Sequence, residues 1–216
     1  MNDVKDTTKQ VQWQLFEGTI IKDYQGKKSG LDVGVYYGQL LHGMRDGYGI
    51  LYTTNAENEP LLFECEWRKG LPIKGSYIQI WENQWHKHYG FLDESFTLTS
   101  SGKRIDEDGD QYIGMWKNGK RHGKGKLVYT TIGSYEGEWE FGYYHGYGRR
   151  TQQNGEYQDG SWNRSKGAEG MHSFYNKDGT EKQKIDYQKQ SLFGPVPGYN
   201  GMNINRSSTS AVFYKR

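Results

Sequence analysis

One sequence pattern occurs twice in this chain. Residues 112–129 read YIGMWKNGKRHGKGKLVY, and residues 135–152 read YEGEWEFGYYHGYGRRTQ. Seven aromatic, glycine and histidine positions recur with a constant shift of 23 residues. The matched pairs are Tyr112 and Tyr135, Gly114 and Gly137, Trp116 and Trp139, Gly119 and Gly142, His122 and His145, Gly123 and Gly146, and Gly125 and Gly148. A fixed period of this length predicts a repeat architecture, in which each copy buries its apolar face against its neighbours.

Weaker copies flank the clean pair. Residues 36–52 repeat the glycine skeleton, residues 63–77 keep one tryptophan, and residues 77–90 keep another. Gly160 and Trp162 continue the register on the other side. We therefore expect a repeat array over residues 36–175. Residues 91–111 break the spacing and are expected to form an irregular insertion, either an inserted loop or an irregular hairpin.

Each copy is typical of a β-hairpin. In residues 135–140 aromatic residues and glycine alternate with Glu136, Glu138 and Glu140, which is the period of a strand with one buried face. Residues 141–146 are expected to form the turn, and Gly146 to start the return strand. The predicted fold is all-β, an elongated, twisted antiparallel sheet of stacked hairpins.

The recurring residues are predicted to pack the array. Only 33% of the chain is hydrophobic but 15% is aromatic, and one aromatic side chain buries about 150–250 Å². Glycines on the inner face leave room for large rings, so Gly137 and Trp139 are expected to pack together. The aromatic content and the fixed glycine spacing argue against disorder. The predicted packing residues are Tyr36, Gly38, Trp67, Trp81, Tyr112, Gly114, Trp116, Gly123, Tyr135, Gly137, Trp139, Gly146, Gly160 and Trp162.

The two ends of the chain lack the period. Residues 1–35 are expected to form an N-terminal arm and a degenerate first hairpin. Residues 176–216 are expected to form a last turn and an extended C-terminal arm, with Leu192, Phe193 and Phe213 as apolar anchors toward a partner.

Charge and cysteine content narrow the class of protein. Lys and Arg number 28 against 26 Asp and Glu, a net charge of +2, whereas a dedicated nucleic-acid binder is usually far more basic. The single cysteine cannot form an internal disulfide, which favours a reducing compartment. We find no signal sequence and no run of roughly 20 apolar residues. These features predict a cytoplasmic protein.

No catalytic or metal centre is predicted. His86 and His88 are spaced to share a strand face, while His122 and His145 lie one repeat apart. A zinc site needs three or four converging ligands, and these histidines do not supply them. We expect His86 and His88 on an exposed strand and the other two histidines bonded within their turns. No catalytic residue, cofactor or metal is therefore assigned.

A run of basic residues lies between the repeated positions, within residues 117–126. It could bind anionic lipid headgroups, face an acidic protein, or pair with the acidic strand 136–140. Its members are Lys117, Lys120, Arg121, Lys124 and Lys126.

The unit Y-x-G-x-W-x-x-G-x-x-H-G-x-G resembles the MORN repeat, and residues 112–125 and 135–148 match it throughout. The resemblance implies hairpin arrays that scaffold, mediate contacts or approach membranes without catalysis. Small stand-alone proteins of this type occur in cilia and flagella, including radial spoke heads. We therefore expect a non-enzymatic structural protein in a large hetero-oligomeric assembly, most simply a cytoskeletal component of the ciliary axoneme. The alternative is a membrane-associated adaptor that binds anionic phospholipids through its basic turns.

Overall fold

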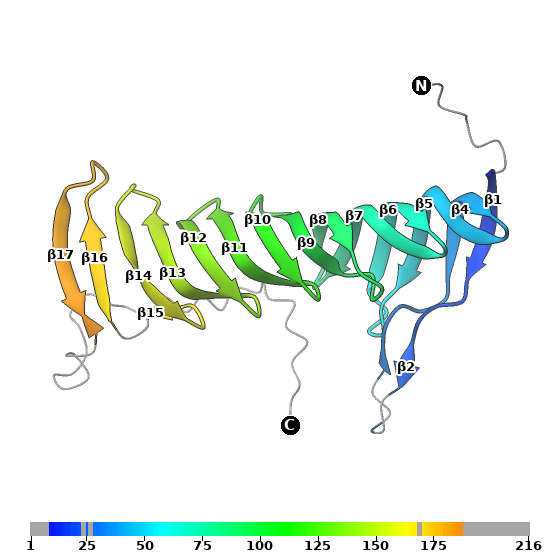
Figure 1. Cartoon of the computed structure of the whole chain (residues 1–216), viewed down its shortest axis with the longest axis horizontal. Coiled ribbons are helices and arrows are strands. Elements are labelled where there is room, and N and C mark those ends of the chain that lie inside the picture. Colours follow the sequence, from blue (N-terminus) through cyan, green and yellow to red (C-terminus); the bar gives the residue numbers. More distant parts are fainter. Residues whose placement is uncertain (1–8, 23–24, 26–27, 168–169, 188–216) are drawn as a thin grey trace. The chain divides into compact units, whose positions relative to one another are not determined.

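The computed structural model describes residues 9–22, 25, 28–167 and 170–187. The regular secondary structure in these ranges is almost entirely β-strand. The chain divides into two compact units, residues 1–111 and 112–216. In each unit the strands of the main sheet lie side by side in chain order, as Figure 1 shows. The predicted all-β fold, an antiparallel array of stacked hairpins, is confirmed.

The first unit contains a sheet in the order β1-β4-β5-β6-β7-β8-β9, with every neighbouring pair antiparallel. A separate two-stranded sheet, β2-β3, lies between β1 and β4 in the sequence. The strands are β1 (Gln10–Phe16), β2 (Ile21–Lys22), β3 (Lys28–Ser29), β4 (Gly34–Leu41), β5 (Met44–Thr54), β6 (Pro60–Arg68), β7 (Leu71–Trp81), β8 (Gln84–Leu92) and β9 (Leu98–Asp106).

The second unit begins within β10 and continues in the order β10-β11-β12-β13-β14-β16-β17, with the short β15 paired to β14. Its strands are β10 (Gln111–Lys117), β11 (Lys120–Tyr129), β12 (Gly133–Glu140), β13 (Tyr143–Gln152), β14 (Tyr157–Asn163), β15 (Lys166–Gly167), β16 (Met171–Tyr175) and β17 (Glu181–Asp186).

Two-residue turns join six pairs of consecutive strands. Both residues of each turn have positive φ, as a type I′ turn requires, and this turn matches the twist of the flanking strands. The turns are His42-Gly43, Lys69-Gly70, Glu82-Asn83, Asn118-Gly119, Phe141-Gly142 and Arg164-Ser165.

The turn expected over residues 141–146 is therefore too long. Phe141 and Gly142 reverse the chain by themselves, and β13 begins at Tyr143. Gly146 lies inside β13 next to a shift in register, with a φ of 52°. A Cβ on Gly146 would lie 2.3 Å from a carboxylate oxygen of Glu138. Glycine is therefore needed for the irregular pairing inside β13 and not for the turn.

On the inner face of the sheet, tyrosine rings lie over pairs of glycines. Gly137 and Gly148 face each other across β12 and β13. A Cβ on Gly148 would lie 2.3 Å from the Tyr135 hydroxyl oxygen and 2.6 Å from its ring. The Tyr135 hydroxyl donates to the Glu138 carbonyl at 3.0 Å. Tyr36 and Tyr112 donate in the same way, at 3.0 Å, to Gln39 and Met115.

A tryptophan from the next hairpin completes each tyrosine site. The Trp139 indole donates to the Gly125 carbonyl at 3.0 Å, and its ring stands edge-on to Tyr112, at 5.1 Å between centroids and 81° between planes. The expected pairing of Gly137 with Trp139 is thus wrong. Tyr135 and Gly148 fill the space at Gly137, so Trp139 bonds one hairpin back. The equivalent bonds are Trp162 to Gly148 at 3.0 Å and Trp67 to Gly49 at 3.1 Å.

Residues 91–111 belong mostly to paired strands, and the pairing of β8 with β9 has a shift in register between Gly90 and Phe91, so this region forms an irregular hairpin and not an inserted loop. It contains the end of β8, the whole of β9 and the start of β10. The loop after β8 lacks a turn glycine, but the Asp93 carboxylate accepts from the backbone N–H groups of Ser95 and Thr97 at 3.0 Å each. Phe96 takes the positive φ, 62°, and its buried ring contacts the core around Phe63 at 5.9 Å.

Parts of both terminal segments form paired strands, and the last turn predicted after residue 175 lies between β16 and β17. Gln10–Phe16 is a sheet strand paired with β4, because its alternating side chains place Phe16 in the core. Glu181–Asp186 pairs with β16 and completes a hairpin. The proposed anchors Leu192, Phe193 and Phe213 lie outside the described residues.

Replacing Trp139 with alanine should destabilise the second unit by about 3–5 kcal/mol, because a buried ring and its hydrogen bond are lost together. Urea unfolding followed by circular dichroism measures the change. Tyr147→Ala, in the adjoining strand, removes a side chain that is 63% exposed and serves as the control. Equal stability of the Trp139 variant and the parent would refute this packing scheme.

Candidate functional site

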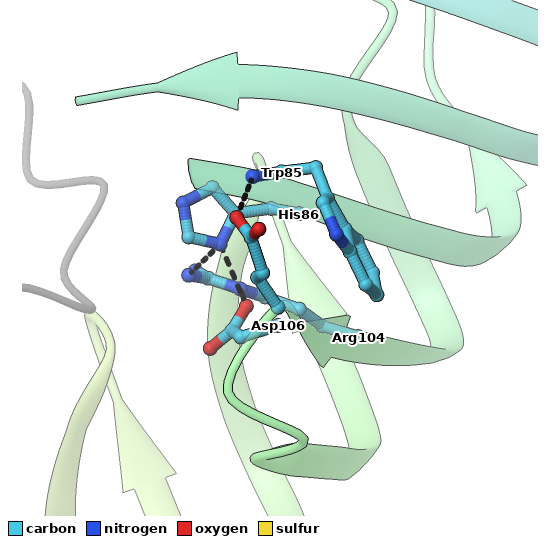
Figure 2. A network of polar contacts seen from close by, with 5 residues as sticks. Trp85, His86, Arg104 and Asp106 are labelled. Carbon is cyan, nitrogen blue, oxygen red and sulfur yellow. Dashed lines mark hydrogen bonds and ion pairs between the residues drawn. The ribbon is translucent and has the colours of Figure 1, made fainter. Parts of the chain in front are cut away.

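A buried polar cluster lies on β8 and β9 (Figure 2). His86 Nδ1 is 2.8 Å from the Asp106 carboxylate oxygen Oδ1, and Arg104 Nε donates to the same oxygen at 2.6 Å. Arg104 Nη2 lies 3.1 Å from His86 Nδ1. Since Asp106 can only accept when ionised, His86 Nδ1 carries the proton and donates it to the carboxylate. The two donors hold one carboxylate in a fixed position.

The loop after β9 is bonded back to the start of β8, next to this cluster. The backbone N–H of Trp85 donates to the Glu107 carboxylate at 3.1 Å, and the Glu107 N–H donates to the Trp85 carbonyl at 3.1 Å. Figure 2 shows the dashed line from the backbone nitrogen of Trp85 and the separate contacts among His86, Arg104 and Asp106. The cluster therefore joins two neighbouring strands through both side chains and backbone.

Burial and charge act on the cluster in opposite directions. Burial raises the pKa of Asp106, but the hydrogen bond from His86 and the positive charge of Arg104 outweigh it and bring the pKa below its ordinary value. The carboxylate stays ionised and paired. Such a pair is a structural anchor, because removing one partner would leave a buried charge uncompensated.

His88 is the second buried histidine of β8. It stacks on Tyr77 with 4.2 Å between ring centroids and 4° between planes, and it lies opposite Arg104 in the register of β8 and β9. Burial, followed by the charge of Arg104, holds the pKa of His88 well below its usual range. The ring is neutral at physiological pH.

The expectation that His86 and His88 lie on an exposed strand face is wrong. The two side chains do share a face of β8, as their spacing predicts, but they are only 3% and 4% exposed. The strand register places His88 opposite Tyr77, whose ring belongs to the core. With so little exposure, neither imidazole can reach a substrate from solution.

The other histidines do not converge with them. His145 Nδ1 is 3.5 Å from a Glu140 carboxylate oxygen, and the His122 ring stands 6.5 Å from that of Phe141. Among the described residues, no group of three or more His, Cys, Asp and Glu side chains could hold a metal ion. Cys65 is buried, and burial raises the pKa of its thiol to about 12, so it is a poor nucleophile.

The basic run divides into residues with different roles. Arg121 is a packing residue, since its guanidinium lies 4.5 Å from the centre of the Trp139 ring and donates to the Gly142 carbonyl at 3.1 Å. Lys126 pairs with Glu136 at 2.9 Å, which confirms the predicted pairing with the acidic strand for this residue. Lys117 and Lys124 are exposed, and Lys120 is half-buried.

The arginine site is a repeat position that sequence reasoning missed. Arg45 occupies it in the first unit, where its guanidinium lies 5.4 Å from the Trp67 ring and donates to the Gly70 carbonyl at 3.0 Å. Both arginines are the second residue after a turn glycine, which is the signal that could have revealed them. Tyr144 holds the place in the next copy and stacks on Tyr135 at 3.7 Å.

The outer face of the second unit carries a row of alternating charges. Lys126, Glu136, Arg149 and Asp159 lie opposite one another on successive strands. Arg149 forms two hydrogen bonds of 2.7 Å to the Asp159 carboxylate. Because each of these cations faces a carboxylate on a neighbouring strand, the charges of this row neutralise one another.

The outer face of the first unit is apolar over β1, β4 and β5. Two cross-strand rows run through it, one from Leu15 and one from Trp13. The Trp13 and Tyr37 rings are 4.6 Å apart. The side chains of this apolar patch are between 42% and 72% exposed, and contiguous patches of this kind mark interaction surfaces. The patch consists of Val11, Trp13, Leu15, Val35, Tyr37, Ile50 and Tyr52.

The buried histidine makes the first unit sensitive to acid. His88 has a lower pKa in the folded state than the value of about 6.5 in an unfolded chain. The unfolded chain therefore takes up more protons as the pH falls below about 6.5, and this group can reduce the free energy of unfolding by up to about 1.4 kcal/mol per pH unit. The Asp106 contribution is lost only at lower pH, below its unfolded pKa.

Hydrogen exchange of the β7–β9 amides between pH 7 and pH 5 measures this effect after correction for intrinsic exchange rates. His88→Phe keeps a ring beside Tyr77 but cannot titrate, so its stability should decline less steeply than that of the parent. Parallel pH profiles for the two proteins would contradict the assignment.

Comparison with known proteins bears on the repeated hairpins. The family model of the MORN repeat matches residues 36–55, 112–131 and 135–157. These segments begin at Tyr36, Tyr112 and Tyr135, the three tyrosines that donate to a carbonyl three residues on. No curated protein shows significant similarity to the chain.

MORN repeats are interaction modules of an adaptor type, which contact proteins or membranes, and not an enzyme family. Among the described residues, no helix has the length and apolar character needed to cross a membrane. The matched segments and the ladder of tyrosine, glycine and tryptophan agree in position, and the chain is a MORN-repeat protein.

Proposed function

We propose that this protein is a non-enzymatic scaffold that binds other proteins and holds them in a large hetero-oligomeric assembly. The observation that carries the proposal is the apolar patch on the outer face of the first unit. Seven large side chains remain exposed there, although the inner face of the same strands has a filled aromatic core.

The packing of the repeats supports a mechanical role. Three repeat tyrosines are each fixed by a backbone carbonyl of their own hairpin, and three tryptophans each bond to the hairpin before; they are Tyr36, Tyr112 and Tyr135, and Trp67, Trp139 and Trp162. Stability in such arrays comes from neighbour contacts, and the sheet faces are left for partners. The polar residues that first suggest chemistry, His86, His88 and Arg121, are engaged in this packing.

Protein is a better partner than lipid for these surfaces. Binding to anionic lipid depends on basic side chains that face the membrane, at about 1 kcal/mol each. In the second unit Arg121 is stacked on Trp139 and Lys126 faces Glu136. The apolar patch of the first unit consists of aliphatic and aromatic side chains without a lysine or arginine. Aromatic residues with few charges are typical of the centre of protein interfaces.

The assembly we propose is the ciliary axoneme, with a radial spoke head as the specific setting. The support is the likeness of the repeat unit to small stand-alone MORN proteins of cilia and flagella. A stiff sheet with an apolar outer face suits a structure whose parts must keep fixed positions under load.

The proposal predicts retention of the tagged protein in axonemes after detergent extraction of ciliated cells. Tyr37→Lys with Tyr52→Lys places two charges in the apolar patch and should release the protein into the soluble fraction. Tyr147→Lys, at a side chain that is 63% exposed in the second unit, should stay with the axoneme. Absence from cilia, or equal retention of all three proteins, would overturn the proposed setting or the proposed patch.

Vesicle binding separates a scaffold from a membrane adaptor. The full chain should not sediment with vesicles of phosphatidylserine and phosphatidylcholine at physiological salt, because Arg121 packs on Trp139 and Lys126 pairs with Glu136. Of the basic run, Lys117, Lys120 and Lys124 would have to carry the binding. Sedimentation that is lost when these three lysines are changed to glutamine would favour the adaptor. Arg121 is left intact in that variant, since its loss would damage the fold.

A further inference from the structure

The strand β1 ends the sheet of the first unit with an unusual edge. It pairs with β4 in seven consecutive positions, from Gln10 opposite Leu40 to Phe16 opposite Gly34, without a register shift. Among the described residues, no strand pairs with its other edge. A long, regular edge of this kind exposes backbone donors and acceptors that another strand can bind.

Residues 10–16 carry none of the features that usually protect an edge. The segment QVQWQLF contains no charged residue and no proline. Val11, Trp13 and Leu15 are 56%, 72% and 63% exposed on the outer face. On the other face, Gln12 donates to Gln10 at 2.7 Å, and both glutamines are exposed. The edge is apolar on one side and made of neutral amides on the other.

The last strand of the second unit, β17, has features that protect a sheet edge from further pairing. Four of the six residues of β17 are charged, namely Glu181, Lys182, Lys184 and Asp186. Its pairing with β16 also contains an irregularity, between Phe174 and Tyr175. Charges and bulges of this kind discourage the addition of a further strand. Only β1 of these two terminal strands is built to accept one.

We propose that β1 pairs in antiparallel fashion with β1 of a second copy, giving a two-fold symmetric dimer. The strand that best fits β1 must bring apolar residues to Val11, Trp13 and Leu15 and neutral amides to the glutamines. The sequence of β1 has that pattern itself. In an antiparallel self-pairing centred on Gln12 or Trp13, odd-numbered residues face odd-numbered residues, so Val11 and Trp13 meet apolar side chains of the second copy and Gln12 meets a glutamine.

Charge decides against a head-to-tail arrangement. Pairing of β1 with β17 would set the apolar row against Lys182 and Lys184, and would leave the partner with its own β1 exposed. A two-fold pairing uses both β1 edges at once and closes the assembly at two copies. In the dimer the apolar patch would continue across the junction, because the two-fold axis keeps the same face of each sheet outward.

Sedimentation velocity and light scattering on the full chain test the pairing. The parent should have the mass of two chains, and Trp13→Lys should have the mass of one because it brings two like charges together at the junction. Tyr52→Lys places the same charge in the apolar patch but on β5, away from the edge, so it should remain dimeric. Circular dichroism confirms that each variant is folded.

Mixing provides the second measurement. Trp13→Glu should also be monomeric alone, and an equimolar mixture of Trp13→Lys and Trp13→Glu should recover the dimer through opposite charges. A monomeric parent would overturn the proposal, as would a dimer that Trp13→Lys leaves intact or a dimer that Tyr52→Lys disrupts. The result is independent of the scaffold function, since the chain could bind axonemal proteins as a monomer or as a dimer.

Discussion

The fit of a tyrosine ring onto two facing glycines is the contact on which the other features of the hairpins depend. At Tyr135 the ring lies so close to Gly148 that a single added methyl group would overlap the hydroxyl oxygen. This close approach lets the hydroxyl reach a carbonyl of its own hairpin, and it leaves the edge of the ring open to Trp162 of the next one. Trp162 then bonds to the carbonyl of Gly148. One glycine thus fixes both the ring above it and the hairpin that follows.

This arrangement concentrates cohesion on one face of each sheet. The inner face is filled by rings, and the arginines that follow the turns add a guanidinium over the tryptophan. In the first unit the same row ends in a polar cluster, where His88 stacks on Tyr77 and Arg104 and His86 hold Asp106. Burial favours neutral or paired groups at these places, so the cluster contributes anchoring and acid sensitivity but has no route to a substrate.

The outer faces are where the two units differ in character. In the second unit Lys126 and Arg149 lie opposite carboxylates on the neighbouring strands. Exposed ion pairs of this kind keep the surface polar but contribute little to stability. The first unit leaves Trp13, Tyr37 and Tyr52 exposed beside an uncharged edge strand. Both the proposed scaffold role and the proposed dimer use this apolar region, one through its face and the other through its edge.

The sequence by itself determined the repeat and the all-β fold, because period and composition are local properties of the chain. The packing residues predicted from it omit several rings of the core, namely Phe63, Tyr77 and Tyr144. Tyr135, Gly137 and Trp139 can be recognised as structural from spacing alone. Which groups meet was decided only by the tertiary structure. Trp139 bonds to Gly125 and not to its neighbour Gly137, since the contact forms between hairpins.

The same limit applies to the polar residues. Alternation shows that His86 and His88 share a face, but only the register with Tyr77 and Arg104 shows that this face is buried. Arg121 looks like a surface charge until the next hairpin brings Trp139 beneath it. The two-residue alternation of a strand determines which side chains share a face. Whether that face is buried depends on the side chains that the neighbouring strands place against it.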